Sequence, residues 1–125
     1  MKEIRVFVIV AIFSGCSPEL LDDDGYIDKV LRSAAKKSHL TLLYTSIRKF
    51  QPQGVTGIAV IGESHIAVHS WPQHGSFLVD IATCSTKESA AAAFKEITAH
   101  FPDGHIASYR EFDMTNESSL ENYRQ

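Results

Sequence analysis

The sequence predicts an α+β fold, in which a mainly antiparallel sheet carries two helices on one of its faces. Three observations predict it. Six short segments are rich in β-branched and aromatic residues, two segments repeat apolar residues at helical spacing, and short turns containing Gly or Pro separate several of them. The 125 residues suit a single domain, for which we expect residues 1–113, followed by a polar tail over residues 114–125.

The first half of the chain is expected to begin with a buried strand and a helix. Residues 4–13 form an apolar run rich in Val and Ile, which is typical of a strand buried on both faces. Ser17-Pro18-Glu19 marks a helix start, because proline suits the first helical position, and Gly25 interrupts that helix. Residues 40–50 then form the next strand. The apolar face of the helix consists of Ile27, Val30, Leu31, Ala34 and Ala35.

The second half of the chain is expected to hold four strands and a helix. Residues 55–61 and 66–71 flank a tight corner at Gly62-Glu63-Ser64 and form a hairpin, and residues 77–83 and 105–112 supply two further strands. Ser85 to Glu88 read STKE, which is the pattern of a capping box at a helix start. The buried face of that helix is expected to contain Ala90, Ala93, Phe94, Ile97 and Phe101.

The N-terminal run also has the outline of a lipoprotein signal, since basic residues precede it and Cys16 follows small residues. Glu3 among the basic residues, Phe13 in place of a smaller aliphatic residue, and a run of only eight residues favour the strand. We therefore expect a cytoplasmic protein with no membrane partner. The net charge of −3 gives no reason to expect nucleic acid, and two cysteines, Cys16 and Cys84, are expected to stay reduced.

Two helices cover only one face of the predicted sheet, yet the first strand is apolar enough for burial on both faces. A second copy of the chain is the simplest cover for the other face. We expect a homodimer in which the two sheets pack together as a four-layer αββα sandwich.

Several reactive side chains lie close to Ser64 in the sequence. A metal site, a hydrolase nucleophile and a purely structural role are three possible explanations for them. His65 and His69 would share one face of a strand at about 13 Å, which is too far for one metal ion, so no metal site is expected. The segment Gly62 to Ile66 lacks the trailing glycine of a hydrolase elbow. Taken singly, each of these residues is more often structural than catalytic.

The segment ESHIAVHSWPQHGSFLVDIATC, residues 63–84, decides among these explanations. It resembles the signature of the prokaryotic S-adenosylmethionine decarboxylases, which process themselves and use a pyruvoyl group. The similarity continues through KFQPQGVTGIAVI and FSGCSPELL, and it covers roughly residues 4–112.

The resemblance implies a role for five residues. Ser64 would become a covalent pyruvoyl cofactor when the chain is cut after Glu63, giving a β chain of residues 1–63 and an α chain of residues 64–125. His69 and the Thr56 hydroxyl would assist this processing. The pyruvoyl carbonyl would form a Schiff base with the substrate amine, and Cys84 would return a proton to the product.

The resemblance also implies that S-adenosylmethionine is converted to its decarboxylated form for spermidine synthesis. Phe50 matches a position suited to stacking on adenine, and Trp71 belongs to the same substrate-binding set. Gln73 stands where the family has a glutamate, and Ile12 and Ser14 also depart from the family pattern. These departures keep two alternatives open: decarboxylation of L-ornithine or L-arginine by the same chemistry, or an unprocessed homologue that only binds a ligand or partner.

Overall fold

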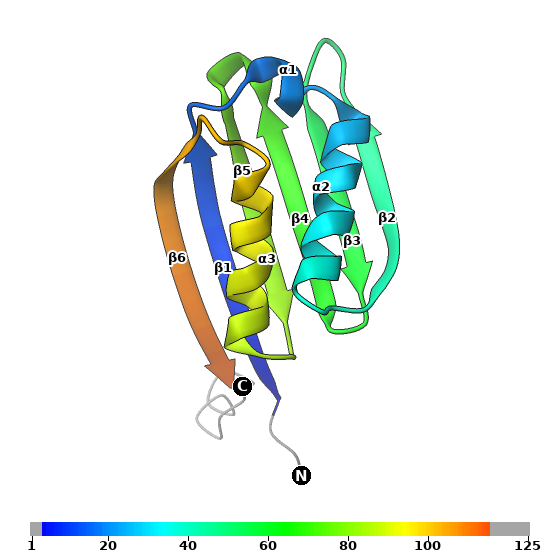
Figure 1. The fold of residues 1–125 in the computed structure, drawn as a ribbon, viewed down its shortest axis with the longest axis vertical. Helices are drawn as coiled ribbons and strands as arrows, with labels where there is room; N and C mark the ends of the chain where they lie inside the picture. Colours follow the sequence, from blue (N-terminus) through cyan, green and yellow to red (C-terminus); the bar gives the residue numbers. More distant parts are fainter. Residues whose placement is uncertain (1–3, 116–125) are drawn as a thin grey trace, which may run out of the picture.

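The structure, a computed structural model, describes residues 4–115 and confirms the predicted α+β fold. One sheet has the strand order β2-β3-β4-β5-β1-β6, and all neighbouring strands are antiparallel. Helices α2 and α3 lie side by side on one face of it (Figure 1). The strands are β1 (Arg5–Ser14), β2 (Leu42–Lys49), β3 (Val55–Ile61), β4 (Ser64–Trp71), β5 (Ser76–Thr83) and β6 (His105–Thr115). The helices are α1 (Pro18–Leu21), α2 (Asp24–Lys37), α3 (Lys87–Ala99) and the short η1 (Pro72–His74).

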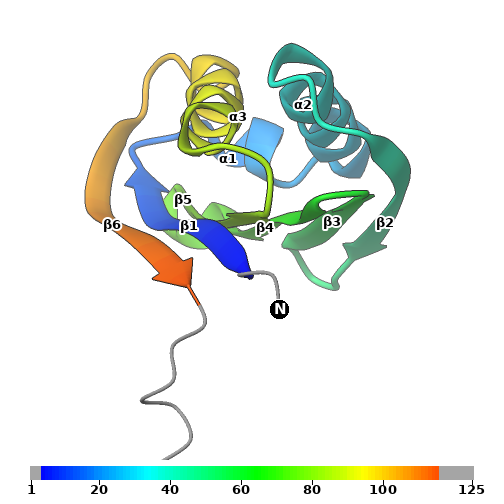
Figure 2. The ribbon, with the colours of Figure 1, turned by 90° about the horizontal axis from the view of Figure 1, so that it is seen from below.

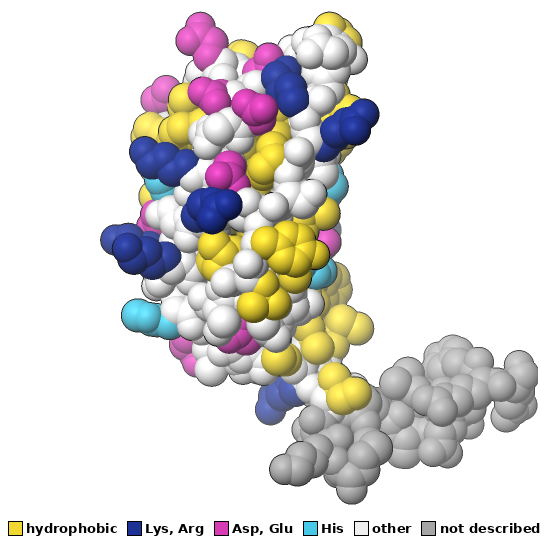
Figure 3. Space-filling model, turned by 90° about the vertical axis from the view of Figure 1, so that its right-hand side faces the viewer, with side chains coloured by type: hydrophobic (Ala, Val, Ile, Leu, Met, Phe, Trp, Pro, Cys, Tyr) yellow, Lys and Arg dark blue, Asp and Glu magenta, His cyan; other side chains and the backbone are white. Residues whose placement is uncertain are grey.

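The second face of the sheet has no helix over it among the described residues (Figure 2). In a single chain the first strand is buried on one face only, because Ile12 on the open face is 39% exposed. Hydrophobic side chains are also exposed on the flank beside β2, where Tyr44 is 58% exposed (Figure 3). Within residues 4–115, no helix is long and apolar enough to span a membrane.

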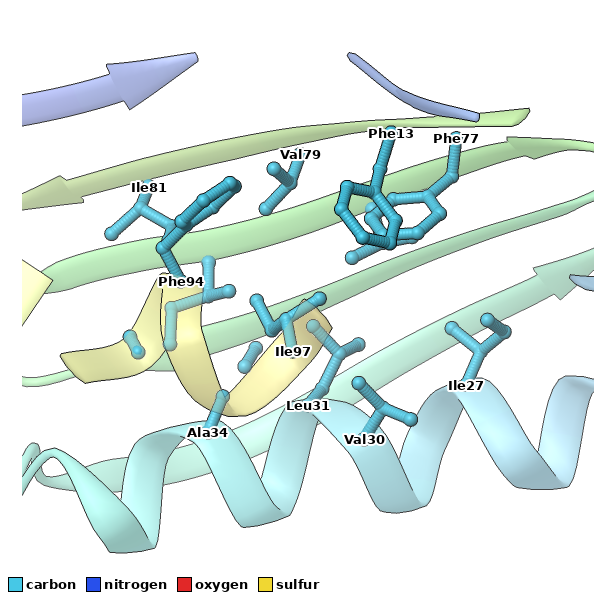
Figure 4. Close-up of a cluster of buried hydrophobic side chains, with 14 of the residues drawn as sticks. Phe13, Ile27, Val30, Leu31, Ala34, Phe77, Val79, Ile81, Phe94 and Ile97 are labelled. Carbon is cyan, nitrogen blue, oxygen red and sulfur yellow. The ribbon is translucent and has the colours of Figure 1, made fainter. Parts of the chain in front are cut away.

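The core lies between the helices and the covered face of the sheet, and side chains from both layers meet there (Figure 4). All the residues predicted for the two apolar helix faces are buried. Gly57 of β3 lets α2 approach closely, because a Cβ atom built on it would lie only 2.8 Å from Cδ1 of Leu31. The shared core residues include Phe13, Phe77, Val79, Ile81, Phe94 and Ile97.

Two helix starts differ from the sequence prediction. The break between α1 and α2 precedes Gly25, because the carboxylate of Asp23 accepts a hydrogen bond from the Tyr26 N–H and begins α2 there. The predicted capping box is wrong, since Thr86 caps α3 by accepting from the Ser89 N–H at 3.0 Å. The Ser85 N–H donates to the Thr83 hydroxyl within the preceding turn, so it is not available to the Glu88 side chain for the reciprocal bond of a capping box.

Two strands extend by two or more residues beyond the predicted bounds. β4 begins at Ser64 itself, so the turn before it is confined to Gly62 and Glu63. β6 continues to Thr115, two residues into the expected tail, and residues 116–125 of that tail lie outside the described part of the chain. The β4 boundary matters for the site, because it fixes Ser64 in hydrogen-bonded register between two neighbouring strands.

Candidate active site

Ser64 occupies a strained position where the β3–β4 hairpin turns. It pairs with Ile61 on β3 and with Thr83 on β5, and its φ is 144°. Residues with a side chain rarely adopt such a positive φ, and the cost of a comparable backbone outlier is on the order of 1–3 kcal/mol. The hairpin corner proposed from the sequence is thus strained at the serine itself.

The peptide bond before Ser64 presents a fixed carbonyl. The oxygen of Glu63 accepts a hydrogen bond from the Cys84 N–H at 2.9 Å. A donor aimed at this oxygen polarises the carbonyl and would stabilise the negative charge that develops when a nucleophile adds to its carbon. The arrangement therefore brings Glu63, Ser64 and Cys84 together, as the sequence analysis expected. The role of the Cys84 N–H was missed, because no side-chain pattern reports a backbone donor.

His65 is the histidine that contacts Ser64 within this chain. Its Nδ1 lies 3.4 Å from the Ser64 hydroxyl oxygen, and its Nε2 lies 3.5 Å from Oδ1 of Asp80 on β5. These are long contacts, at the limit of hydrogen bonding. They nevertheless link the Asp80 carboxylate, the His65 imidazole and the Ser64 hydroxyl, and no role for Asp80 was predicted from the sequence.

His69, the predicted processing histidine, lies at the other end of β4. It follows Ser64 by five residues, which corresponds to about 16 Å along a strand. Its Nδ1 lies 3.2 Å from the hydroxyl of Thr56 on the neighbouring strand β3, so the two predicted processing side chains do lie together. They do not lie at Ser64. A single chain therefore separates the predicted site residues into two groups.

The second group lines a hollow of about 290 Å³ at the far end of β4. Phe50 and Trp71 contribute aromatic rings that are 44% and 43% exposed. Gln73 lines the same hollow, whereas Ile12 and Ser14 on β1 do not. The remaining lining residues are Gln53, Gly54, Thr56, His69 and Ser70.

Asp22 secures the loop that carries Phe50. Its Oδ1 accepts hydrogen bonds from Nζ of Lys49 at 2.7 Å and from the Gly54 N–H at 2.8 Å. These bonds, the lysine first, lower the pKa of the Asp22 carboxyl below its ordinary value. The Phe50 N–H closes the same loop by donating to the Gly54 carbonyl at 2.8 Å. The loop is thus held on both sides of the aromatic ring.

Residues 4–115 contain no group of three His, Cys, Asp or Glu side chains that could hold a metal ion. Both cysteines are free thiols, with Cys16 buried and Cys84 exposed. Burial raises the pKa of the Cys16 thiol to about 11.

Comparison with known proteins gives the family. The family model for S-adenosylmethionine decarboxylase matches residues 8–112. The chain belongs to the S-adenosylmethionine decarboxylase family. An S-adenosylmethionine decarboxylase proenzyme of Methanococcus maripaludis strain S2 is 43% identical over 84 residues, which cover 67% of this chain and 68% of the relative. The proenzyme of Acetivibrio thermocellus is 34% identical over 100 residues, covering 80% and 81% of the two chains.

A solved structure of the family shares the fold. The crystal structure of the adenosylmethionine decarboxylase from Aquifex aeolicus VF5 superposes with a TM-score of 0.76 at 26% sequence identity, and the match covers 91% of both chains. The similarity in fold therefore extends over nearly the whole of this chain.

Proposed function

We propose that this chain is a self-processing, pyruvoyl-dependent decarboxylase of S-adenosylmethionine. The observation that carries the proposal is the strained Ser64, placed directly after a carbonyl that the Cys84 N–H polarises. Cleavage there would yield a β chain of residues 1–63 and an α chain of residues 64–125. The relatives reported above are named proenzymes, which agrees with a chain made in an uncut form.

The geometry fits the generation of the cofactor from the chain itself. The Ser64 hydroxyl adds to the carbonyl carbon of Glu63, the peptide C–N bond breaks, and the nitrogen takes up the proton that the hydroxyl loses. The resulting ester loses the Cα proton of residue 64 and releases Glu63 with a free carboxylate. Hydrolysis of the remaining enamine, through its imine, releases ammonia and leaves the pyruvoyl carbonyl. Cleavage also removes the φ torsion that strains Ser64, so the stored strain favours the cut state.

The pyruvoyl group would supply an electron sink for the loss of carbon dioxide. The residues of this chain would bind the substrate and move protons. The Cys84 thiol is exposed next to the cleavage point, where it can return a proton to the product. Phe50 and Trp71 offer aromatic faces to a purine ring or to a sulfonium cation, and Gln73 can hydrogen-bond ribose hydroxyls.

S-adenosylmethionine fits the hollow better than a basic amino acid does. The described residues that line it include no carboxylate, whereas the distal cation of L-ornithine or L-arginine calls for one. The names of the relatives reported above also favour S-adenosylmethionine. Its decarboxylated product would feed spermidine synthesis.

We further propose that the working unit is a homodimer packed through the open sheet face. That face carries half-buried or exposed apolar side chains on five of the six strands, including Val8, Val10, Ile12, Tyr44, Ile58, Val60, Leu78 and Phe112. A two-fold axis that lies in the plane between the two sheets, perpendicular to the strands, would make the two facing β4 strands run antiparallel. Ser64 of one copy would then face the end of β4 that carries His69 in the other copy, which joins the two groups of site residues.

Two measurements test the proposed function. Intact mass under denaturing conditions should show two fragments divided between residues 63 and 64, and a Ser64→Ala variant should remain one chain. Carbon dioxide release should then be measured with S-adenosylmethionine, L-ornithine and L-arginine in parallel, and we expect turnover of the first alone. A wild-type chain that stays uncut after long incubation would instead identify a non-catalytic binding homologue. Turnover of either amino acid would refute the substrate assignment.

A further inference from the structure

We propose that Thr41 is a positioning residue for self-cleavage, an inference that rests on the proposed function. Thr41 precedes β2 and lies outside the hairpin that is cut. It nevertheless makes three hydrogen bonds to the two turn residues. Its carbonyl accepts from the Gly62 N–H at 2.8 Å, its N–H donates to Oε1 of Glu63 at 2.9 Å, and its hydroxyl donates to Oε2 at 3.0 Å.

These bonds hold the residue whose carbonyl is attacked. The Glu63 side chain is fixed by Thr41 on one side, and the Glu63 carbonyl oxygen is fixed by the Cys84 N–H on the other. A strained backbone persists only where its surroundings prevent it from relaxing. Rotation of the peptide between residues 63 and 64 is the obvious route by which Ser64 could leave its φ of 144°. Anchoring both ends of Glu63 opposes that rotation.

The charge of Glu63 is part of this anchor. Hydrogen bonds from Thr41, the backbone N–H first, lower the pKa of the Glu63 carboxyl below its ordinary value. The carboxylate therefore stays ionised into mildly acidic solution, and both of its oxygens remain strong acceptors. The hydrogen bonds of Thr41 go to the Gly62 N–H and to the Glu63 carboxylate, and not to the Ser64 hydroxyl, so Thr41 acts through Glu63 and not on the reacting atoms.

The test is the rate of cleavage of newly made precursor, followed by pulse–chase in cell-free translation. Thr41→Val keeps the shape and the N–H but removes the hydroxyl, and we expect cleavage to slow about tenfold. Thr41→Ser restores the hydroxyl and should restore the rate. Glu63→Gln keeps the shape and removes the charge, so it provides a second slowed variant if Thr41→Val folds poorly. Thr45→Val is the matched control, since Thr45 also hydrogen-bonds a carboxylate but pairs with Ala59, away from the turn at Gly62 and Glu63.

The pH dependence separates positioning from general destabilisation. The cleavage rate of the wild type should fall at acidic pH as Glu63 becomes protonated. This fall should begin at higher pH in Thr41→Val, because the pKa of Glu63 moves back toward its ordinary value. The part of the profile that is due to Glu63 should be absent in Glu63→Gln, whereas any fall due to protonation of a histidine that moves protons in cleavage should remain in every variant. A Thr41→Val chain that cleaves at the wild-type rate with the wild-type profile would overturn the role of Thr41, as would an equal slowing in Thr45→Val. A wild-type chain that never cleaves refutes the proposed function instead.

Discussion

If His69 of one copy transfers protons during cleavage at Ser64 of the other copy, mixing two variants that are inactive alone should restore cleavage. Within one chain the two residues are about 16 Å apart along β4, whereas a proton is transferred over about 3 Å. No side-chain rotation closes that gap inside a rigid strand. The Ser64→Ala chain cannot be cut, and we expect the His69→Asn chain to be uncut when it pairs with itself.

The assay co-expresses the two variants, with a mass tag on the His69→Asn chain. A mixed dimer has one complete site, formed by Ser64 of the tagged chain and His69 of the Ser64→Ala chain. Fragments should therefore arise from the tagged chain alone. With equal amounts and free pairing, about half of the tagged chains sit in mixed dimers, which sets the expected yield of fragments. An excess of the Ser64→Ala chain should raise this yield.

His65→Asn is the control on the same strand, because His65 contacts Ser64 within its own chain. If His65→Asn abolishes cleavage and His69→Asn has no effect, proton transfer runs through the Asp80–His65 contact inside one chain. That result, or the absence of fragments from the mixed dimers, would refute the shared site.

Three further predictions concern reactivity and stability. Iodoacetamide at about pH 8 should alkylate exposed Cys84 before buried Cys16, whose thiol has a pKa raised to about 11, as peptide mass mapping will show. Gly57→Ala should lower the free energy of unfolding by about 1–3 kcal/mol in urea titrations, because its Cβ would press on Leu31. The Asp22 carboxyl has a lowered pKa in the folded state, so its contribution to stability is present above its ordinary value of 3.8 and is lost as the pH falls through the folded value. Asp22→Asn should therefore lower Tm near neutrality and flatten its decline in acid, as measured by scanning calorimetry.

The elements of the fold were largely predictable, because their patterns are local. The apolar faces of α2 and α3 follow helical spacing, and β3 runs over the same residues that the sequence predicted. The errors concern caps, where neighbouring polar residues compete for the same N–H groups. At α3 the Thr86 hydroxyl accepts from the Ser89 N–H, and the Ser85 N–H donates to Thr83 and not to Glu88, as a capping box would require. A motif of residue types does not report that competition.

For the candidate site, the sequence named residues and proposed roles for them, but it did not give their spatial arrangement. The sequence correctly associated Glu63, Ser64 and Cys84, since neighbouring strands β4 and β5 bring them together. The strand spacing that separates His65 from His69 already indicated that His69 lies far from Ser64 in the same chain, but the resemblance to the family transferred a role to His69 without that distance. The contacts of His65 with Asp80 depend on the register of β4 against β5, which only the structure provides.

The distance between Ser64 and His69 along β4 bears on the order of folding, pairing and cleavage. If cleavage needs His69, a chain that carries a strained Ser64 but has no His69 nearby would keep the bond between residues 63 and 64 intact while it folds. Pairing of two open sheet faces would then bring the missing side chains to each Ser64 at the moment when solvent is excluded from the interface. Cleavage would follow assembly if His69 reaches Ser64 only from the other copy. It would also follow folding, since the bonds that anchor Glu63 come from Cys84 after β5 and from the residue before β2. The cut between residues 63 and 64 would thus mark chains that have both folded and paired.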